Sequence, residues 1–143
     1  MAVFKSVEEA RPYFSDDRFA TENGIRLDEL DETHSVCSLE IGPRHQNAFG
    51  GVMGGAIFTL ADFAFATLTN DREHITVAQQ VSINYLSPVK GKRLTATATF
   101  KKDGRSSCVV NVDVTDDLGR DIAQFVGTGF KLAPVSRPRP NMV

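Results

Sequence analysis

Residues 52–69 read VMGGAIFTLADFAFATLT, and this stretch decides the fold. Its apolar residues recur at helical spacing and almost every other position is apolar or small, which predicts a helix buried on most of its sides. The stretch approaches the length of a membrane-spanning helix. However, it opens near a glycine pair, holds three threonines and carries one charge, Asp62, near its centre. These features favour a helix enclosed by protein over one that faces lipid.

Strand patterns lie on both sides of the predicted helix. The segments alternate apolar with polar residues, as half-buried strands do, and turn residues such as Asp103-Gly104 separate them. Two strands precede the helix, joined as a hairpin, and four follow it as an antiparallel meander. The predicted strands cover residues 24–31, 34–41, 77–85, 94–101, 110–114 and 122–130.

The order of these elements predicts an α+β fold. A single apolar helix beside a meander is buried only if the sheet curls around it. We therefore expect an antiparallel sheet of five or six strands wrapped around one long central helix. Ser6 and Glu9 form a capping-box pattern, which predicts a short N-terminal helix to about Phe14.

Length and charge limit the number of domains and the classes of partner. With 143 residues, 41% of them hydrophobic, the chain suffices for one domain with a real core, which we expect to span residues 1–143. The net charge of −2, with basic and acidic residues mixed along the chain, provides no basic stripe for a nucleic acid. We expect no nucleic-acid partner and no membrane attachment.

The cysteines and the N-terminal residues predict the cellular location of the protein. Cys37 and Cys108 lie far apart, without a C-x-x-C motif or a Cys/His cluster, and are expected to be buried small hydrophobes. The N-terminus lacks the basic and apolar regions that secretion requires, so a reducing, cytoplasmic location is expected. The tail, residues 134–143, has three prolines and is expected to be extended and loosely held.

Residues 47–66 carry the functional signal, and they read NAFGGVMGGAIFTLADFAFA. This segment resembles the signature of the PaaI-type (phenylacetate-pathway) thioesterases of the hotdog superfamily, which is roughly N-x-x-G-x-x-H-G-G-x-x-F-x-L-A-D-x-A-x-A. The Asn, the Gly residues, the Phe, the Leu-Ala-Asp and both later Ala residues fall in register without a gap. Weaker features, such as residues 84–88, extend the resemblance over most of the chain. It implies the hotdog fold and a 4-hydroxybenzoyl-CoA thioesterase-like hydrolase.

The resemblance also implies catalytic roles. Asp62 would be the nucleophile or the general base, the backbone N–H of Gly54 would polarise the thioester carbonyl, and Asn47 would orient substrate or water. The chemistry of the residues agrees with these roles. Glycines that open a helix offer free N–H groups and the positive end of the dipole to a developing oxyanion. A lone carboxylate in apolar sequence favours a raised pKa, and hence a stronger base.

Each of these residues also has a structural interpretation. Asp62 could accept hydrogen bonds from the backbone or from hydroxyls, Asn47 could simply hold a turn, and the glycines could serve close helix packing. For Asp62, the surrounding motif favours catalysis. His45, near Asn47, is expected to be solvated. Because His45, His34 and His74 show no ligand spacing, we expect no metal and no cofactor.

Met53 departs from the family pattern, since it occupies the position where the family usually has His. A thioether cannot donate a hydrogen bond or carry a proton. We interpret the family's histidine as a group that positions its neighbours, so Met53 should affect the rate more than the reaction type. The family's Ser or Thr on the following strand also lacks a clear equivalent. Gln79 or Gln80 is the nearest candidate.

Other residues are expected to contact the substrate. Phe58 and the neighbouring phenylalanines are compatible with an aromatic or a medium-length aliphatic acyl group. Among the basic residues near two turns, which could also be simply solvated, Arg105 is the best candidate for the phosphates of coenzyme A, because a guanidinium binds phosphate bidentately. The predicted substrate-binding residues are Gly55, Met53, Phe58, Gln79, Gln80 and Arg105.

The spacing of the catalytic residues predicts a dimer. Gly54 and Asp62 are eight residues apart, which separates them by roughly 12 Å along one helix, too far for both to contact one thioester. A two-fold dimer would place Asn47 and Gly54 of one chain against Asp62 of its partner, as the resemblance also implies. We expect an obligate homodimer, arranged further as a dimer of dimers (homotetramer).

These observations predict hydrolysis of an acyl-CoA thioester, either by direct attack of water or through an acyl-Asp62 intermediate. A second hypothesis is a non-catalytic hotdog protein that binds or senses acyl-CoA, because a fold alone does not fix a function. Asp62 and Asn47 argue against this hypothesis, and Met53 argues mildly for it. A third hypothesis is a hotdog hydratase or dehydratase. The sequence does not show the His-plus-acid pattern that is typical of such enzymes.

Overall fold

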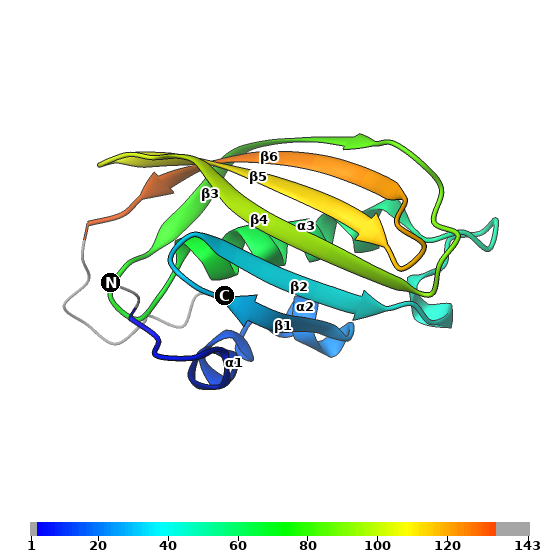
Figure 1. The fold of residues 1–143 in the computed structure, drawn as a ribbon, viewed down its shortest axis with the longest axis horizontal. Coiled ribbons are helices and arrows are strands. Elements are labelled where there is room, and N and C mark those ends of the chain that lie inside the picture. The colour runs from blue at the N-terminus through cyan, green and yellow to red at the C-terminus, as the bar shows by residue number, and fades with distance from the viewer. Residues whose placement is uncertain (1–2, 134–143) are drawn as a thin grey trace.

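A computed structural model describes residues 3–133 of the chain. One long helix, α3, lies across the concave face of a curved antiparallel sheet (Figure 1). Two short helices pack beside this long helix. The expected α+β architecture is confirmed, with six strands. The elements in chain order are α1 (Val7–Phe14), α2 (Arg18–Glu22), β1 (Ile25–Leu30), β2 (His34–Glu40), a 3-10 turn (Pro43–His45), α3 (Gly54–Thr69), β3 (Thr76–Tyr85), β4 (Arg93–Asp103), β5 (Ser107–Asp116) and β6 (Asp121–Lys131).

The order of the strands in the sheet is β1-β2-β4-β5-β6-β3. The expected β1–β2 hairpin and the meander from β4 to β6 are confirmed. The prediction that β3 continues the meander was wrong, because β3 pairs with β6 and forms the far edge of the sheet. Alternation of apolar and polar residues predicts that a segment is a strand, but it carries no information about its neighbour.

The sheet buries α3 as the sequence predicted. The helix contacts all six strands, and Leu60, Ala61 and Ala64 are fully buried. Close packing of its second half depends on two glycines in β6. A Cβ atom built on Gly127 would lie 3.0 Å from the ring of Phe65, and one on Gly129 would lie 3.1 Å from it. These glycines provide the space that the ring occupies.

The N-terminal segment forms two helices rather than the one that was predicted. Ser6 caps α1 by accepting a hydrogen bond from the N–H of Glu9 at 3.2 Å. The returning bond of the capping box differs, because the Glu9 carboxylate accepts from the N–H of Lys5 instead of Ser6. Phe14 then packs edge-to-face on Phe63 of α3, with 6.4 Å between ring centroids. The five-residue helix α2 was missed, because one turn and a half is too short for a periodic pattern.

The two cysteines lie inside the protein. Cys37 and Cys108 are free and buried, as expected. Burial raises the pKa of the Cys37 thiol to about 12, which makes it chemically inert.

The tail at 134–143 lies outside the described residues. Within residues 3–133, no helix combines the length and the apolar character that crossing a membrane requires.

Candidate active site

The segment between the 3-10 turn and α3 forms a small closed loop, residues 46–53. Gln46 and Val52 form an isolated antiparallel bridge at its base. Inside it, the Asn47 side chain oxygen accepts hydrogen bonds from the N–H groups of Phe49 (2.9 Å) and Gly51 (3.1 Å). The structural interpretation of Asn47 as a turn residue is therefore confirmed. Its Nδ2 group has no hydrogen-bond partner among residues 3–133, which leaves it able to donate to a ligand.

The loop leads directly into the first turn of α3. Met53 is the N-cap, with an extended backbone and no side-chain cap, and its side chain is 56% exposed. The N–H groups of Gly54 and Gly55 have no partner among the described residues. They stand at the positive end of the helix dipole, where a carbonyl oxygen that gains negative charge is stabilised. Two adjacent N–H groups are thus available to donate to a ligand oxygen at this end of the helix.

Tyr85, the last residue of β3, completes this end of the helix. Its hydroxyl donates a hydrogen bond to the carbonyl of Gly54 at 3.0 Å. A Cβ atom on Gly54 would lie only 3.2 Å from the phenol ring and oxygen, so a glycine allows this close contact. The sequence showed Tyr85 only as a strand residue within a family-like segment. Its contact with Gly54 joins positions 31 residues apart, and no local pattern reveals such a contact.

Asp62 lies at the centre of α3, and its side chain is half-buried. Burial raises the pKa of its carboxyl, and the negative charge of Asp17 raises that pKa further. No backbone N–H or hydroxyl among residues 3–133 donates a hydrogen bond to it. A carboxylate with a structural role is expected to have such donors. Its absence from the local hydrogen-bond network weakens the structural interpretation of Asp62.

His45 contradicts the prediction that it is solvated, since it is only 5% exposed. Its Nδ1 accepts a hydrogen bond from the N–H of Gly42, and its Nε2 bonds the carbonyl of Asn23 at 2.7 Å. The sequence suggested an exposed loop, but the end of α2 covers this residue. Because α2 itself was not predicted, neither was the burial of His45.

Three other predicted residues lie on two different elements, with Phe58 one turn after Gly54 on α3 and the two glutamines on β3. Phe58 is partly buried, and its ring packs edge-to-face on Phe125 with 5.6 Å between centroids. Gln79 and Gln80 are both exposed on the edge strand β3, beside a bulge that shifts the register between Ala78 and Gln80. The structure shows no contact of either glutamine with Asp62.

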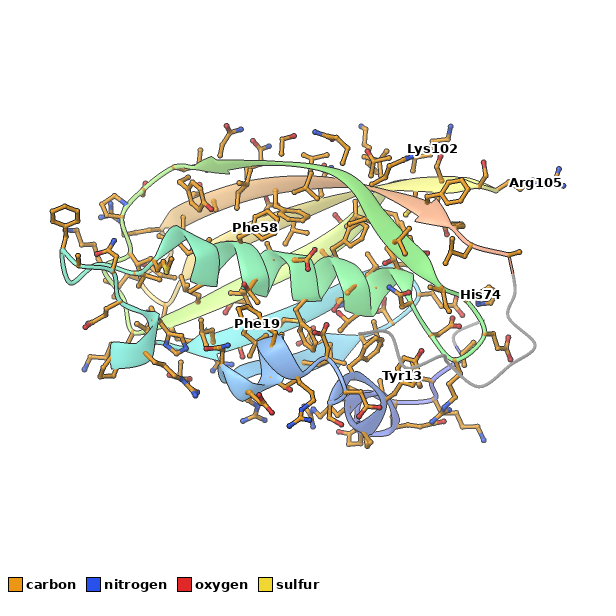
Figure 2. All side chains as sticks on the ribbon, turned by 180° about the vertical axis from the view of Figure 1, so that it is seen from behind. Tyr13, Phe19, Phe58, His74, Lys102 and Arg105 are labelled. Carbon is orange, nitrogen blue, oxygen red and sulfur yellow. The ribbon has the colours of Figure 1, made fainter. Side chains whose placement is uncertain are left out.

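Arg105 lies at the opposite end of the molecule from the start of α3 (Figure 2). It lines a cavity of about 560 Å³ beside the C-terminal end of the helix, together with Thr67 and Asn70. Neither Gly54 nor Asp62 lines this cavity. The cavity beside Arg105 is therefore separate from the predicted catalytic residues of the same chain.

Histidines and carboxylates do not form a metal centre in the described part of the chain, where no group of three potential ligands occurs. His34 and His74 each contact the aspartate three residues before them, Asp31 and Asp71. These pairs close local turns. The candidate site residues themselves offer a carboxylate, an amide and backbone N–H groups.

The sequence of the chain is similar to those of a known family and of several curated proteins. A family model described as a domain of unknown function, DUF4442, matches residues 5–128, which is most of the chain. The chain belongs to this family. Several curated relatives have names that state an activity, either acyl-coenzyme A thioesterase or putative esterase. The chain is 28% identical over 129 residues to acyl-coenzyme A thioesterase PaaI of Escherichia coli, covering 90% of this chain and 92% of that protein. It is 33% identical to human acyl-coenzyme A thioesterase 13 over 93 residues, covering 62% and 66%.

Solved structures agree with the sequence matches. The structure of E. coli PaaI matches this chain with a TM-score of 0.81 at 27% identity, over 86% of this chain and 90% of that one. A hypothetical thioesterase from Streptococcus pneumoniae, solved with coenzyme A, matches with a TM-score of 0.77 at 27% identity, over 86% and 99%. These matches confirm that the chain is a PaaI-type member of the hotdog thioesterases.

Proposed function

We propose that this protein hydrolyses acyl-CoA thioesters to a free acid and coenzyme A. The relatives named as acyl-CoA thioesterases support this reaction class. The observation that carries the proposal is the state of Asp62, a half-buried carboxylate with a raised pKa and no hydrogen-bond donor among the described residues. A carboxylate in this state is a stronger base and a better nucleophile than one in water.

The N–H groups at the start of α3 and the carboxylate of Asp62 have different roles in the proposed reaction. The thioester carbonyl oxygen accepts hydrogen bonds from the N–H groups at the start of α3, which polarise the carbonyl carbon. Water adds to this carbon and gives its proton to the Asp62 carboxylate, or Asp62 itself adds first and water then cleaves the acyl-Asp62 anhydride. In both routes the carbon–sulfur bond breaks, and the departing thiolate takes up a proton to give coenzyme A.

A complete site requires a second copy of the chain. Gly54 and Asp62 stand roughly 12 Å apart along α3, so one thioester cannot contact both in a single chain. The edge strand β3 supports an interface, because it is ten residues long and largely exposed and, within residues 3–133, pairs only with β6. A long unpaired edge is a ready surface for association. We propose a two-fold homodimer with two composite sites, assembled further into a tetramer.

The substrate-binding roles follow from the same assembly. Asn47 offers its Nδ2 group beside the oxyanion site, and Phe58 offers an aromatic ring to the acyl group. Arg105 lies at the C-terminal end of α3. It can therefore reach the phosphates of a coenzyme A bound at Gly54 only from another chain. A structural relative solved with coenzyme A supports such a ligand.

A non-catalytic acyl-CoA-binding protein is the second candidate function. Met53 favours it, because the exposed thioether occupies the position of the family's histidine at the start of α3. Binding without turnover across a broad substrate panel would support this candidate over hydrolysis.

The deciding experiment measures thiol release from a panel of aryl- and medium-chain acyl-CoAs. We expect turnover of at least one of them. Asp62→Asn should bind that acyl-CoA as the wild type does but lower kcat by at least ~10²-fold. Asp113→Asn is the matched control, since it neutralises an exposed carboxylate on β5 and should leave kcat unchanged. Full activity of folded Asp62→Asn would show that this carboxylate does not take part in the chemistry.

The cellular location rests on the cysteines. Both are free and buried, which suits a reducing compartment. We propose the cytoplasm, which immunolocalisation or cell fractionation would test.

A further inference from the structure

His45 is the buried histidine of the described chain, and the proposed reaction leaves it without a chemical role. Its two ring nitrogens bond backbone groups on two different segments. The N–H of Gly42 donates to Nδ1 at 2.9 Å, and Nε2 bonds the carbonyl of Asn23 at 2.7 Å. An N–H group can only donate and a carbonyl can only accept. These two contacts fit the tautomer of the ring that carries its proton on Nε2.

The backbone of His45 closes the loop that carries Asn47. Its carbonyl accepts a hydrogen bond at 2.8 Å from the N–H of Met53, the residue immediately before Gly54. The bridge between Gln46 and Val52 extends this closure by one residue pair. One residue thus holds both ends of the loop together, and its ring attaches the closed base to the rest of the protein.

Arg44 provides a second attachment to the same place. Its guanidinium donates to the carbonyl of Glu22 at 2.8 Å, next to the carbonyl that His45 bonds. Glu22 is the last residue of α2 and Asn23 is its C-cap, so both carbonyls belong to the helix end, where backbone acceptors lack partners within the helix. Gly24 makes this contact possible, because it has a φ of +90° and a Cβ atom there would lie 2.7 Å from the guanidinium.

We propose that His45 is a positioning residue for the oxyanion site, through which α2 holds loop 46–53 and the first turn of α3 in the geometry that binds the thioester. His45 does not contact substrate itself. The proposal rests on the proposed function. It gives the N-terminal helices, which lie outside the motif, a role in substrate binding. A displacement of about 1 Å at a reacting group can lower a rate by roughly 10²-fold, so a small shift of the loop base would suffice.

Three substitutions separate the two bonds of the ring. His45→Asn places an amide oxygen near Nδ1 and can keep the bond from Gly42 while losing that to Asn23. His45→Gln places an amide nitrogen near Nε2 and can keep the bond to Asn23. His45→Phe fills the space and removes both bonds. We expect kcat/KM to fall by ~10- to 100-fold in His45→Phe and by less in His45→Gln, whose bond attaches the loop to α2.

A matched control separates positioning from general stability. Thr67→Val removes the buried 2.6 Å hydrogen bond between Thr67 and Ser35, in the half of α3 that is far from the loop. We expect it to lower Tm as His45→Phe does, while kcat/KM below that Tm stays at the wild-type value. His45→Phe should lower kcat/KM at the same temperature.

Hydrogen–deuterium exchange gives a readout that does not depend on catalysis. We expect the amides of residues 46–56 to exchange faster in His45→Phe than in Thr67→Val, with His45→Gln between His45→Phe and the wild type. Unchanged exchange in all three His45 variants, or equal loss of activity in Thr67→Val, would overturn the proposal. A wild-type protein that releases no thiol would refute only the proposed function, because the exchange pattern still tests the positioning of the loop.

Discussion

The two halves of α3 differ in what surrounds them, and this difference separates fold from function within one helix. The second half is enclosed, since Phe63, Phe65 and Thr67 are all at most 2% exposed. The first half begins at an exposed loop, with N–H groups that have no partner among residues 3–133. Asp62 stands at the boundary between the halves. Both halves pack on the sheet, since Leu60 and Ala61 of the first half are buried too, but only the first half begins with N–H groups that have no partner among the described residues.

The enclosed half shows how the sequence specifies the sheet around it. The Phe65 ring fits where Gly127 and Gly129 leave space in β6, and Thr67 shares a hydrogen bond of 2.6 Å with Ser35 of β2. Among residues 3–133, every polar side-chain group that enters this core has a partner. The open half leaves the N–H groups of Gly54 and Gly55 without a partner among residues 3–133, as a site that must bind a ligand does.

The largest expected effect is on the enclosed half. Phe65→Ala should lower the free energy of unfolding by about 3–5 kcal/mol, because a fully buried ring leaves a cavity. Phe58→Ala, in the open half, should cost less than half as much, since its ring is only partly buried. Thermal or urea unfolding of both variants checks this difference. Equal losses would show that the two halves contribute alike to the fold.

The next effect concerns the open half. Gly54→Ala should lower kcat/KM by at least ~10-fold, because the added methyl group meets the Tyr85 ring beside the proposed oxyanion site. The Tm should change little, because alanine favours the helix by about 1 kcal/mol and this gain offsets the steric cost. Gly55→Ala is the control. A Cβ atom there meets only the Met53 side chain, at 3.7 Å, so its loss of kcat/KM should be smaller. Equal losses would argue against a close approach at Gly54.

Met53→His restores the residue that the family usually has. We expect an active protein whose kcat differs from that of the wild type by less than ~10²-fold, because the change affects positioning rather than proton transfer. Steady-state kinetics with the preferred acyl-CoA measure this. A far larger gain would mean that the natural chain is a non-catalytic relative.

The smallest effect is a shift of the pH profile. The charge of Asp17 raises the pKa of Asp62, so replacing Asp17 with a neutral asparagine should lower that pKa towards its ordinary value. If ionised Asp62 is the active form, the acid limb of kcat/KM then moves to lower pH in Asp17→Asn. The shift should be partial, because burial is the larger cause of the raised pKa and persists. Asp16→Asn, at the neighbouring exposed position, should leave the acid limb in place. A shift to higher pH would contradict the assignment.

The sequence predicted the features that depend on local pattern. The burial of α3 follows from apolar residues at helical spacing, and the strands β4, β5 and β6 follow from clean alternation with turns between them. The motif made Asp62 and the glycine pair the candidate site residues because it is ungapped over twenty positions, 47–66, and their roles stay predictions.

The features that were missed depend on contacts between distant parts of the chain. The pairing of β3 with β6, the burial of His45 under α2 and the bond from Tyr85 to Gly54 each join segments more than 20 residues apart. A single sequence contains no period that reports such contacts. Asn47 was ambiguous for a related reason, since the same side chain can hold a turn with its oxygen and offer its Nδ2 group to a ligand.

The central claim is that the open half of one α3 and Asp62 of another form a single site. Mixing Asp62→Ala with Asn47→Ala chains, after dissociation and reassembly, tests it directly. Each mixed dimer would carry both lesions in one site and keep its other site intact. Random pairing makes about half of the dimers mixed, so roughly a quarter of wild-type activity should return from two nearly inactive parents. No recovery of thiol release, despite demonstrated subunit exchange, would contradict the shared site.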